Sequence, residues 1–210
     1  MDKEYWDKFY KNNKNIETLK EASSFAIFCQ EKFFKYKNKT ILELGSGNGR
    51  DASYFSNNLH TVIAIDQSHE GLKFLSKNIN KNLSYIKDDF VNMDYQKYIN
   101  VDVVYSRFTL HAITEEECTI IINKVSSLLK KGDIFAIEVR STQDPLCGKG
   151  KKIGHNTWFT DHSRRFVDSN NLINKILSKK FKLLYFTEED NLSIYKDDNP
   201  VLIRTIFKKI

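Results

Sequence analysis

Short apolar runs alternate with segments of helical character along most of the chain, and this alternation constrains the fold most. The apolar runs are predicted to be strands, at residues 40–44, 61–65, 83–87, 101–105, 134–139, 181–186 and 201–207. The segments predicted to be helices between them are residues 50–58, 68–80, 114–131 and 166–178. Such alternation is typical of an open, mostly parallel α/β sheet, and the last two strands, joined by a short loop, indicate an antiparallel edge. Ligands of these sheets bind outside the carboxyl ends of the strands.

The composition agrees with a single domain over residues 1–210. Of its 210 residues 40% are hydrophobic, which is enough for a core. Three cysteines without a C-x-x-C pattern argue against a disulfide scaffold and for a reducing compartment. We find no signal peptide and no membrane span, so we expect a cytoplasmic protein with no membrane partner. The net charge of +6 suits anionic partners without indicating nucleic acid in particular.

A glycine-rich segment follows the first predicted strand directly. It reads Glu43-Leu-Gly45-Ser46-Gly47-Asn-Gly49. Glycines let the backbone turn tightly and approach a ligand closely. Taken alone, the pattern fits a plain strand-to-helix turn equally well, so its meaning depends on the neighbouring strand ends.

Acidic residues end the next two predicted strands. Asp66 follows the second strand, with Gln67 beside it, and Asp88-Asp89-Phe90 follows the third. A carboxylate at Asp66 can accept hydrogen bonds from both hydroxyls of a ribose. Asp89 can accept one from an adenine amino group while Phe90 packs on the ring. Three strand ends in one cleft therefore predict an adenosyl ligand.

A nicotinamide-dependent dehydrogenase is the main competing interpretation, because it too uses an acidic residue after the second strand. Its glycine pattern is G-x-G-x-x-G, whereas this chain has G-x-G-x-G. No second domain remains for a substrate, and the Asp-Asp-Phe segment would have no role. The dehydrogenase interpretation explains fewer of the residues.

The glycine segment and the acidic strand ends together resemble class I S-adenosylmethionine-dependent methyltransferases. The residues that carry the resemblance are Glu43, Gly45, Gly47, Gly49, Asp66, Asp89 and Phe90. The resemblance covers residues 38–210 and implies a Rossmann-like, seven-stranded, mostly parallel sheet in the order 3-2-1-4-5-7-6, with helices on both faces. It also implies S-adenosyl-L-methionine as the cofactor.

The resemblance further implies which residues hold that cofactor. Gly45 and Gly47 would line the methionine part, Asp66 would hold the ribose, and Asp89 and Phe90 would hold the adenine. The amphipathic segment 1–37 resembles the helical cap of such enzymes. The remaining residues predicted to bind the cofactor are Tyr10 and Ser24 in this cap, and Glu43, Ser46, Gln67 and Ser106 at the strand ends.

The segment after the fourth predicted strand would lie beside the methyl group to be transferred. It contains Arg107, predicted to bind substrate, and His111, predicted to be the catalytic residue. His111 can act as a general base. It can equally orient the loop or bind the substrate, and the sequence does not separate these roles.

Residues 140–165 are predicted to form a long polar connection inserted after the fifth strand. Connections of 2–6 residues are usual there, and longer ones are commonly functional. Basic residues suited to phosphate or carboxylate cluster in it. Those predicted to bind substrate are Arg140, His155, His162, Arg164 and Arg165. A solvated basic loop is the alternative. The histidines lack a compact metal-binding spacing, so we expect no metal.

This connection also resembles small methyltransferases of bacterial surface-polysaccharide clusters, including those linked to capsular O-methyl phosphoramidate. That resemblance implies a small anionic acceptor, a phosphorylated or phosphoramidate-bearing nucleotide or sugar. A methyltransferase of the tellurite or thiol type, an RNA methyltransferase and a non-catalytic binding protein are the alternatives. Nucleic acid is the less favoured partner because no base-flipping motif follows the fourth strand. We expect a monomer or a homodimer.

Overall fold

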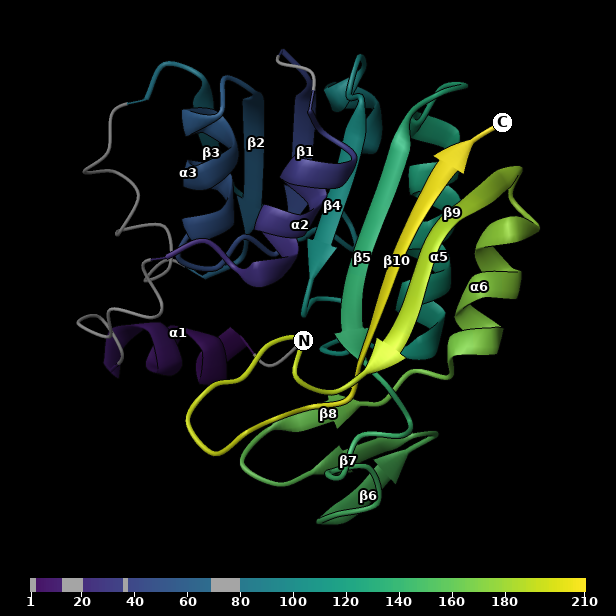
Figure 1. Cartoon of the computed structure of the whole chain (residues 1–210). Coiled ribbons are helices and arrows are strands. Elements are labelled where there is room, and N and C mark those ends of the chain that lie inside the picture. Colours follow the sequence, from purple (N-terminus) through teal and green to yellow (C-terminus); the bar gives the residue numbers. More distant parts are fainter. Residues whose placement is uncertain (1–2, 13–20, 36–37, 69–79) are drawn as a thin grey trace.

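The computed structural model describes residues 3–12, 21–35, 38–68 and 80–210. Its centre is a seven-stranded sheet with helices on both faces (Figure 1). The strands of this sheet are β1 (Thr40–Leu44), β2 (Thr61–Asp66), β3 (Leu83–Lys87), β4 (Val103–Arg107), β5 (Ile134–Arg140), β9 (Phe181–Glu189) and β10 (Leu202–Lys209). The helices described are α1 (Lys3–Asn12), α2 (Ser24–Lys32), α3 (Arg50–Asn57), α5 (Glu115–Leu128), α6 (Ser169–Leu177) and the short 3-10 helix η2 (Tyr95–Tyr98).

The strands of the main sheet lie in the order β3-β2-β1-β4-β5-β10-β9. Strands β1 to β5 pair in parallel, whereas β10 runs antiparallel to both β5 and β9. Counted along this sheet alone, the order is 3-2-1-4-5-7-6. The predicted topology is therefore confirmed, and the carboxyl ends of β1, β2, β4 and β5 meet at one edge.

Two apolar cores cover the two faces of the sheet. One lies under α2 and α3 and includes Ile41 and Val103, and the other lies under α5 and α6 and includes Leu42 and Val104. Successive residues of a strand point to opposite faces, so a central strand is buried along its whole length. Strand β5 is buried at all seven residues, including Glu138 and Arg140 near its carboxyl end. Buried charges of this kind require partners.

Helix α5 begins at a capping box. The Thr114 side chain accepts from the Glu117 backbone N–H, and the Glu117 side chain accepts from the Thr114 N–H. This reciprocal pair satisfies two helix-end donors. The predicted helix 68–80 falls almost wholly on residues 69–79, outside the described residues. The predicted N-terminal segment 1–37 contains α1 and α2, and its residues 1–2, 13–20 and 36–37 are likewise outside them.

The predicted polar connection over residues 140–165 contains three short strands that the sequence did not predict. Strands β6 (Lys151–Gly154), β7 (Thr157–Phe159) and β8 (Ser163–Arg165) form a small antiparallel sheet below the main one (Figure 1). Asn156 turns the chain between the first two strands with φ 46°. Trp158 packs edge-on against Phe166, with ring centroids 5.7 Å apart. Strands of three or four residues are too short to show a recognisable alternation of polar and apolar residues. They could therefore not be predicted from the sequence.

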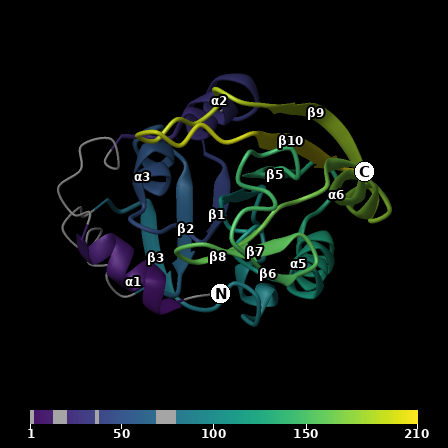
Figure 2. The same ribbon diagram turned by 90° about the horizontal axis from the view of Figure 1, so that it is seen from below.

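The connection between β9 and β10, residues 190–201, is a long one and not the short loop expected from the sequence, although the predicted strand bounds already left residues 187–200 between the two strands. Figure 2 shows this connection in yellow, crossing the sheet edge toward α2. It therefore covers the carboxyl ends of central strands that lie far from it in sequence.

No helix in the described part of the chain is long and apolar enough to cross a membrane.

Candidate active site

One large cavity of about 670 Å³ lies at the carboxyl ends of the strands. Its walls come from the loops after β1, β2, β4 and β5, and it is covered by α1, the start of α2, the segment around β8 and the 190–201 connection. The residues predicted from the sequence that line it are Tyr10, Ser24, Glu43, Gly45, Ser46, Asp66, Gln67, Arg107, His111, Arg140, His162 and Arg164. The strand order separates these residues into a β1–β2 side and a β4–β5 side.

The glycine segment forms the backbone wall on the β1–β2 side. Gly45 and Gly47 have φ of 69° and 57°, the left-handed region that favours glycine. A Cβ on Gly45 would lie 2.6 Å from Thr109 Cγ2, and one on Gly47 would lie 2.0 Å from Tyr10 Oη. Side chains are therefore excluded from both positions by conformation and by space.

Asp66 fixes the shape of this segment. Its Oδ2 accepts from the Gly47 N–H at 2.7 Å, and its Oδ1 accepts from the Ser68 N–H at 2.7 Å. Burial raises the pKa of the Asp66 carboxyl, and the two backbone donors partly oppose that rise. Each carboxylate oxygen has a second lone pair, so Asp66 can hold the loop and still accept from a ligand.

Glu43 is the most unusual polar group of the cavity. It is 4% exposed, and its Oε2 has no hydrogen-bond partner in the described structure. Burial, together with the nearby carboxylates Asp51 and Asp66, raises its pKa well above the usual range. A buried acceptor without a partner is the kind of group that a bound ligand satisfies.

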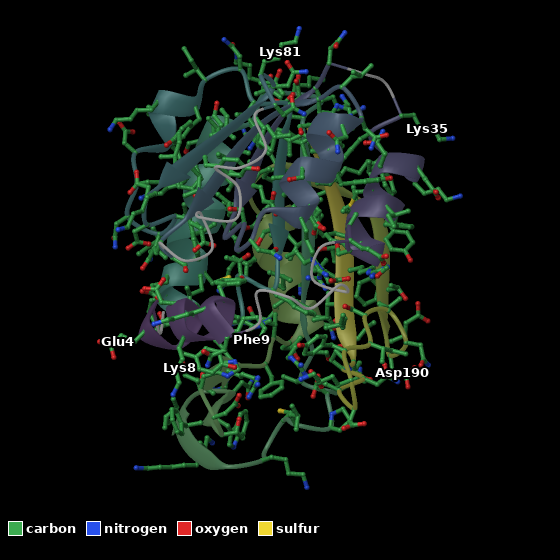
Figure 3. The ribbon with its side chains drawn as sticks, turned by 90° about the vertical axis from the view of Figure 1, so that its left-hand side faces the viewer. Glu4, Lys8, Phe9, Lys35, Lys81 and Asp190 are labelled. Atoms are coloured by element: carbon green, nitrogen blue, oxygen red, sulfur yellow. The ribbon has the colours of Figure 1, made fainter. Side chains whose placement is uncertain are left out.

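The cap contacts both sides of the cavity. On the β1–β2 side, the Ser68 hydroxyl donates to Asp7 Oδ1 at 2.6 Å, and Tyr10 lies over Gly47. Burial raises the pKa of Tyr10 far above its usual value, so its hydroxyl stays protonated. Figure 3 shows Phe9 on the inner side of α1, whereas Glu4 and Lys8 point away from the molecule.

On the β4–β5 side, α1 meets the inserted segment. The Tyr5 ring stacks on His162 with centroids 4.0 Å apart, and the Tyr5 hydroxyl donates to Asp161 Oδ2 at 3.1 Å. Trp6 contacts the same histidine edge-on at 5.6 Å. Burial and the charge of Arg164 outweigh Asp161 and lower the pKa of His162 to about 4. His162 is therefore a neutral ring at neutral pH, packed among aromatic residues.

His111 lines the cavity and is 4% exposed, with no hydrogen-bond partner at Nδ1 in the described structure. Burial lowers its pKa well below the usual range, and the positive charges of Arg140 and Arg164 lower it further. The ring is therefore neutral at neutral pH and can accept a proton. Whether it does so in catalysis stays a prediction.

Two predicted substrate-binding residues point elsewhere. Arg165 donates to the carbonyls of Leu110 and Ile113 at 2.6 and 2.9 Å and pairs with Glu115 at 2.5 Å. It ties β8 to the loop after β4 and does not line the cavity, because it alternates with Arg164 along the strand. His155 lies exposed at the turn between β6 and β7, away from the cavity.

Four predicted cofactor residues do not line the cavity. One is Gly47, which is covered by Tyr10. Phe90 is fully buried in the core below the sheet. Asp89 accepts from the Val91 N–H and from Asn92, and so caps a turn. Ser106 is fully buried within β4. The roles assigned to these residues stay predictions, and the segment 69–79 that follows β2 is outside the described residues.

Sequence reasoning missed the 190–201 connection as part of the site. Its residues from Asn191 to Tyr195, together with Asp198 and Pro200, line the cavity. Arginines from three strands hold it: Arg107 donates to Ser193 Oγ at 2.8 Å, Arg204 donates to the Leu192 carbonyl at 2.9 Å, and Arg140 pairs with Asp198. The length of the polar stretch before the last strand was the available signal, since long connections are often functional.

A buried carboxylate links two of these arginines. Glu138 is fully buried, and its Oε1 lies 2.8 Å from Arg107 Nε while its Oε2 accepts from Arg204 Nε at 2.5 Å. Arg204 also donates to the Ser24 hydroxyl at 2.7 Å. The network therefore joins β4, β5, β10 and the start of α2 beneath the 190–201 connection.

Comparison with known proteins agrees with this geometry. Residues 41–132 match the family model described as a methyltransferase domain. The methyltransferase 235L of Invertebrate iridescent virus 6 is 25% identical over 90% of this chain and 76% of its own length. Methyltransferases of Bacillus anthracis are 28% identical over 106 residues, and the matched part of this chain spans about half of their length.

Solved structures match over almost the whole fold. An S-adenosylmethionine-dependent methyltransferase from Listeria monocytogenes superposes with a TM-score of 0.72 at 19% identity, covering 89% of this chain and 98% of its own. The Burkholderia thailandensis 1,6-didemethyltoxoflavin-N1-methyltransferase, bound to its acceptor and S-adenosylhomocysteine, gives 0.69 at 16% identity, covering 96% and 84%. Residues 41–132 are therefore similar to a methyltransferase domain, and the fold as a whole is that of class I S-adenosylmethionine-dependent methyltransferases.

Proposed function

We propose that this protein uses S-adenosyl-L-methionine to methylate a small anionic acceptor inside the cavity. The observation that carries the proposal is the division of that one cavity of about 670 Å³. Its β1–β2 side presents glycine backbone and carboxylates, with Arg50 beside them. Its β4–β5 side presents arginines and histidines, with Asp161 and Asp198 paired to two of the arginines. A cationic cofactor and an anionic acceptor would meet between them.

The residues on the β1–β2 side fit the cofactor. Asp66 would accept from the ribose hydroxyls, and Glu43 Oε2, which has no partner in the described structure, would accept from the amino group. Gly45, which lines the cavity, allows the close backbone approach that a side chain would block. When bound, the cofactor supplies a methyl group on a sulfonium and the leaving group for its transfer. The Burkholderia relative of this fold is named as bound to S-adenosylhomocysteine.

The coverage of the cavity favours a small acceptor. Helix α1, the segment around β8 and the 190–201 connection all line it, so a folded nucleic acid would have to displace at least one of them. The acceptor named for the Burkholderia relative is also a small molecule. The role of the chain's residues would be to position the acceptor atom in line with the methyl group and to stabilise the charges around it.

The positive groups on the β4–β5 side favour an anionic acceptor. Arg140 and Arg164 line the cavity, and a planar guanidinium suits phosphate and carboxylate oxygens. We extend the proposal to an oxygen of a phosphorylated or phosphoramidate-bearing nucleotide or sugar, as in capsular polysaccharide biosynthesis. Such an oxygen is already ionised and needs orientation only. For a hydroxyl acceptor, His111 would take the proton.

Calorimetry with S-adenosylhomocysteine tests the cofactor part. We expect micromolar binding to the wild type and a loss of about tenfold or more for Asp66→Asn. Asp88→Asn is the matched control, because Asp88 ends the next strand and does not line the cavity. Absence of binding to the wild type would contradict the proposal.

A methyl-transfer screen tests the acceptor part. Labelled cofactor is offered with phosphorylated nucleotides, nucleotide sugars, tellurite, thiols and RNA. We expect product with the phosphorylated small molecules. Turnover of RNA, thiols or tellurite in their place would show that the anionic acceptor is wrongly assigned while leaving the cofactor assignment intact.

A further inference from the structure

Arg140 carries two acidic partners of very different character. The guanidinium is buried at the end of β5 and lines the cavity. Its Nη1 donates to Asp144 Oδ2 at 2.8 Å, and its Nη2 pairs closely with Asp198 Oδ2. A single carboxylate is sufficient to compensate its charge, so the second partner calls for an explanation.

Asp144 is the permanent counter-ion. Its side chain is 1% exposed, it lies four residues after Arg140, and its Oδ1 accepts from the Leu146 N–H at 2.8 Å. Its Oδ2 is therefore bound by the last residue of β5, and its Oδ1 by the loop that follows. Neither water nor a ligand can replace it without breaking that loop.

Asp198 is held much more loosely. Its side chain is 40% exposed. It reaches Arg140 from the 190–201 connection, which lies between β9 and β10 and is distant from Arg140 in sequence. Exposed ion pairs contribute little to stability, since water solvates the separated charges well. The connection does not depend on this pair alone, because Arg107 and Arg204 hold Ser193 and Leu192.

The surroundings favour a negative group at this point. Arg164 lines the same cavity and likewise pairs with an exposed acid, Asp161, at 2.7 Å. The positive charges of Arg140 and Arg164 add to burial in lowering the pKa of His111. A carboxylate on a guanidinium also has the geometry of a phosphate or phosphoramidate oxygen on the same group.

We infer that Asp198 is an exchangeable counter-ion, which occupies on Arg140 the place that the anionic group of the acceptor takes. This inference rests on the proposed function and names the point of attachment within that site. The entering anion displaces Asp198 into water, and Arg140 stays paired with Asp144 throughout. Asp198 thereby selects for acceptors whose anion binds a guanidinium better than a carboxylate does.

Competition with inorganic phosphate tests the exchange. Phosphate is titrated, at low salt and with saturating S-adenosylhomocysteine, into the wild type, Asp198→Asn and Asp197→Asn, and tryptophan fluorescence reports binding. Asp197 is an exposed neighbour that does not line the cavity, so it gives the same change of charge at almost the same place. We expect phosphate to bind about five- to tenfold more tightly to Asp198→Asn and within about twofold of the wild type to Asp197→Asn.

Two results would overturn the inference. An equal gain in both variants would mean that only the overall charge matters. A lower thermal unfolding midpoint of Asp198→Asn without tighter phosphate binding would make the pair a plain latch for the connection. The same titration without S-adenosylhomocysteine separates this test from that of the cofactor, because the exchange at Arg140 should persist even if the cofactor assignment fails.

Discussion

The two sides of the cavity are built in different ways. The β1–β2 side is built around the ends of two adjacent strands, where the Asp66 carboxylate fixes the backbone of the glycine segment at Gly47. The β4–β5 side is assembled from α1, the inserted small sheet and the 190–201 connection. It is held together by buried charges, chiefly Glu138 between Arg107 and Arg204.

This difference determines which substitutions each side of the cavity tolerates. A wall made of backbone is insensitive to charge but intolerant of any added side chain. A wall made of ion pairs from distant segments tolerates changes of size but depends on every counter-ion. Substitutions on the two sides should therefore fail for different reasons, and each experiment below sets one side against the other.

The largest expected effect is the loss of Glu138. Glu138→Gln leaves Arg107 and Arg204 buried without their shared carboxylate, and removing one partner of a buried ion pair costs about 3–5 kcal/mol. Urea denaturation should show this loss. Glu189→Gln, at an exposed residue of the edge strand β9, is the control, with a change within about 0.5 kcal/mol. Equal stability of the two variants would mean that the network does not hold the β4–β5 side.

The next effect should fall on the β1–β2 side alone. Gly47→Ala places a Cβ 2.0 Å from Tyr10 Oη at φ 57°, so the wall must shift, and we expect S-adenosylhomocysteine affinity to fall by about 100-fold. Calorimetry measures it. In Gly148→Ala the new methyl group, at φ 89°, meets no atom within 4 Å, so this control isolates backbone strain. If the double variant Gly47→Ala, Tyr10→Ala partly recovers the affinity, the steric contact with Tyr10 is the cause of the loss. An equal loss of affinity in Gly148→Ala would exclude that contact as the cause.

Neighbouring arginines of β8 should separate stability from acceptor binding. Arg165→Ala strips hydrogen-bond donors from the Leu110 and Ile113 carbonyls, and we expect a loss of about 2 kcal/mol in urea denaturation. Arg164→Ala breaks a more exposed pair with Asp161 and should cost about 0.5 kcal/mol. It should instead raise KM for an anionic acceptor while kcat changes little. The reverse assignment of the two effects would place Arg165 in the acceptor site.

The same two arginines show how far the sequence could lead. Local patterns determine the strands, the glycine segment and Asp66, and the strand order then brings their ends together, so the fold and the β1–β2 side were predictable. Arg164 and Arg165 are the same residue type at neighbouring positions. Only the alternation of side chains along β8 decides which of them lines the cavity. A strand of three residues is too short for that alternation to be recognised in the sequence.

Contacts between distant segments were out of reach for the same physical reason. Nothing local to Asp198 indicates that it meets Arg140, and nothing local to Tyr5 indicates that it stacks on His162. These pairs form because a long connection and an N-terminal helix converge on one sheet edge, which depends on the whole topology. The sequence could nominate charged residues for the β4–β5 side, but it could not pair them.

The last prediction concerns a dependence of stability on pH that arises on the β4–β5 side. Burial lowers the pKa of His162 to about 4, whereas in the unfolded chain a histidine titrates near 6.5. Between these values the unfolded chain binds more protons than the folded one, so stability is complete above about pH 6.5 and falls as the pH decreases toward 4. His111, whose pKa is also lowered, adds to the loss in the same direction.

Urea denaturation at a series of pH values measures this slope. His162→Phe keeps an aromatic ring against Tyr5 but removes the titrating group, so it should flatten the decline between pH 6.5 and 4. His155→Gln, at an exposed histidine away from the cavity, should leave the decline unchanged. A slope that survives in both variants would come from other groups. These include His111 and His60, whose pKa is also lowered by burial, and below about pH 5 Asp161, whose pKa is lowered by its hydrogen bonds to Arg164 and Thr160. Loss of the slope in His162→Phe alone would show that the charges gathered over the β4–β5 side are what make this half of the cavity sensitive to protons.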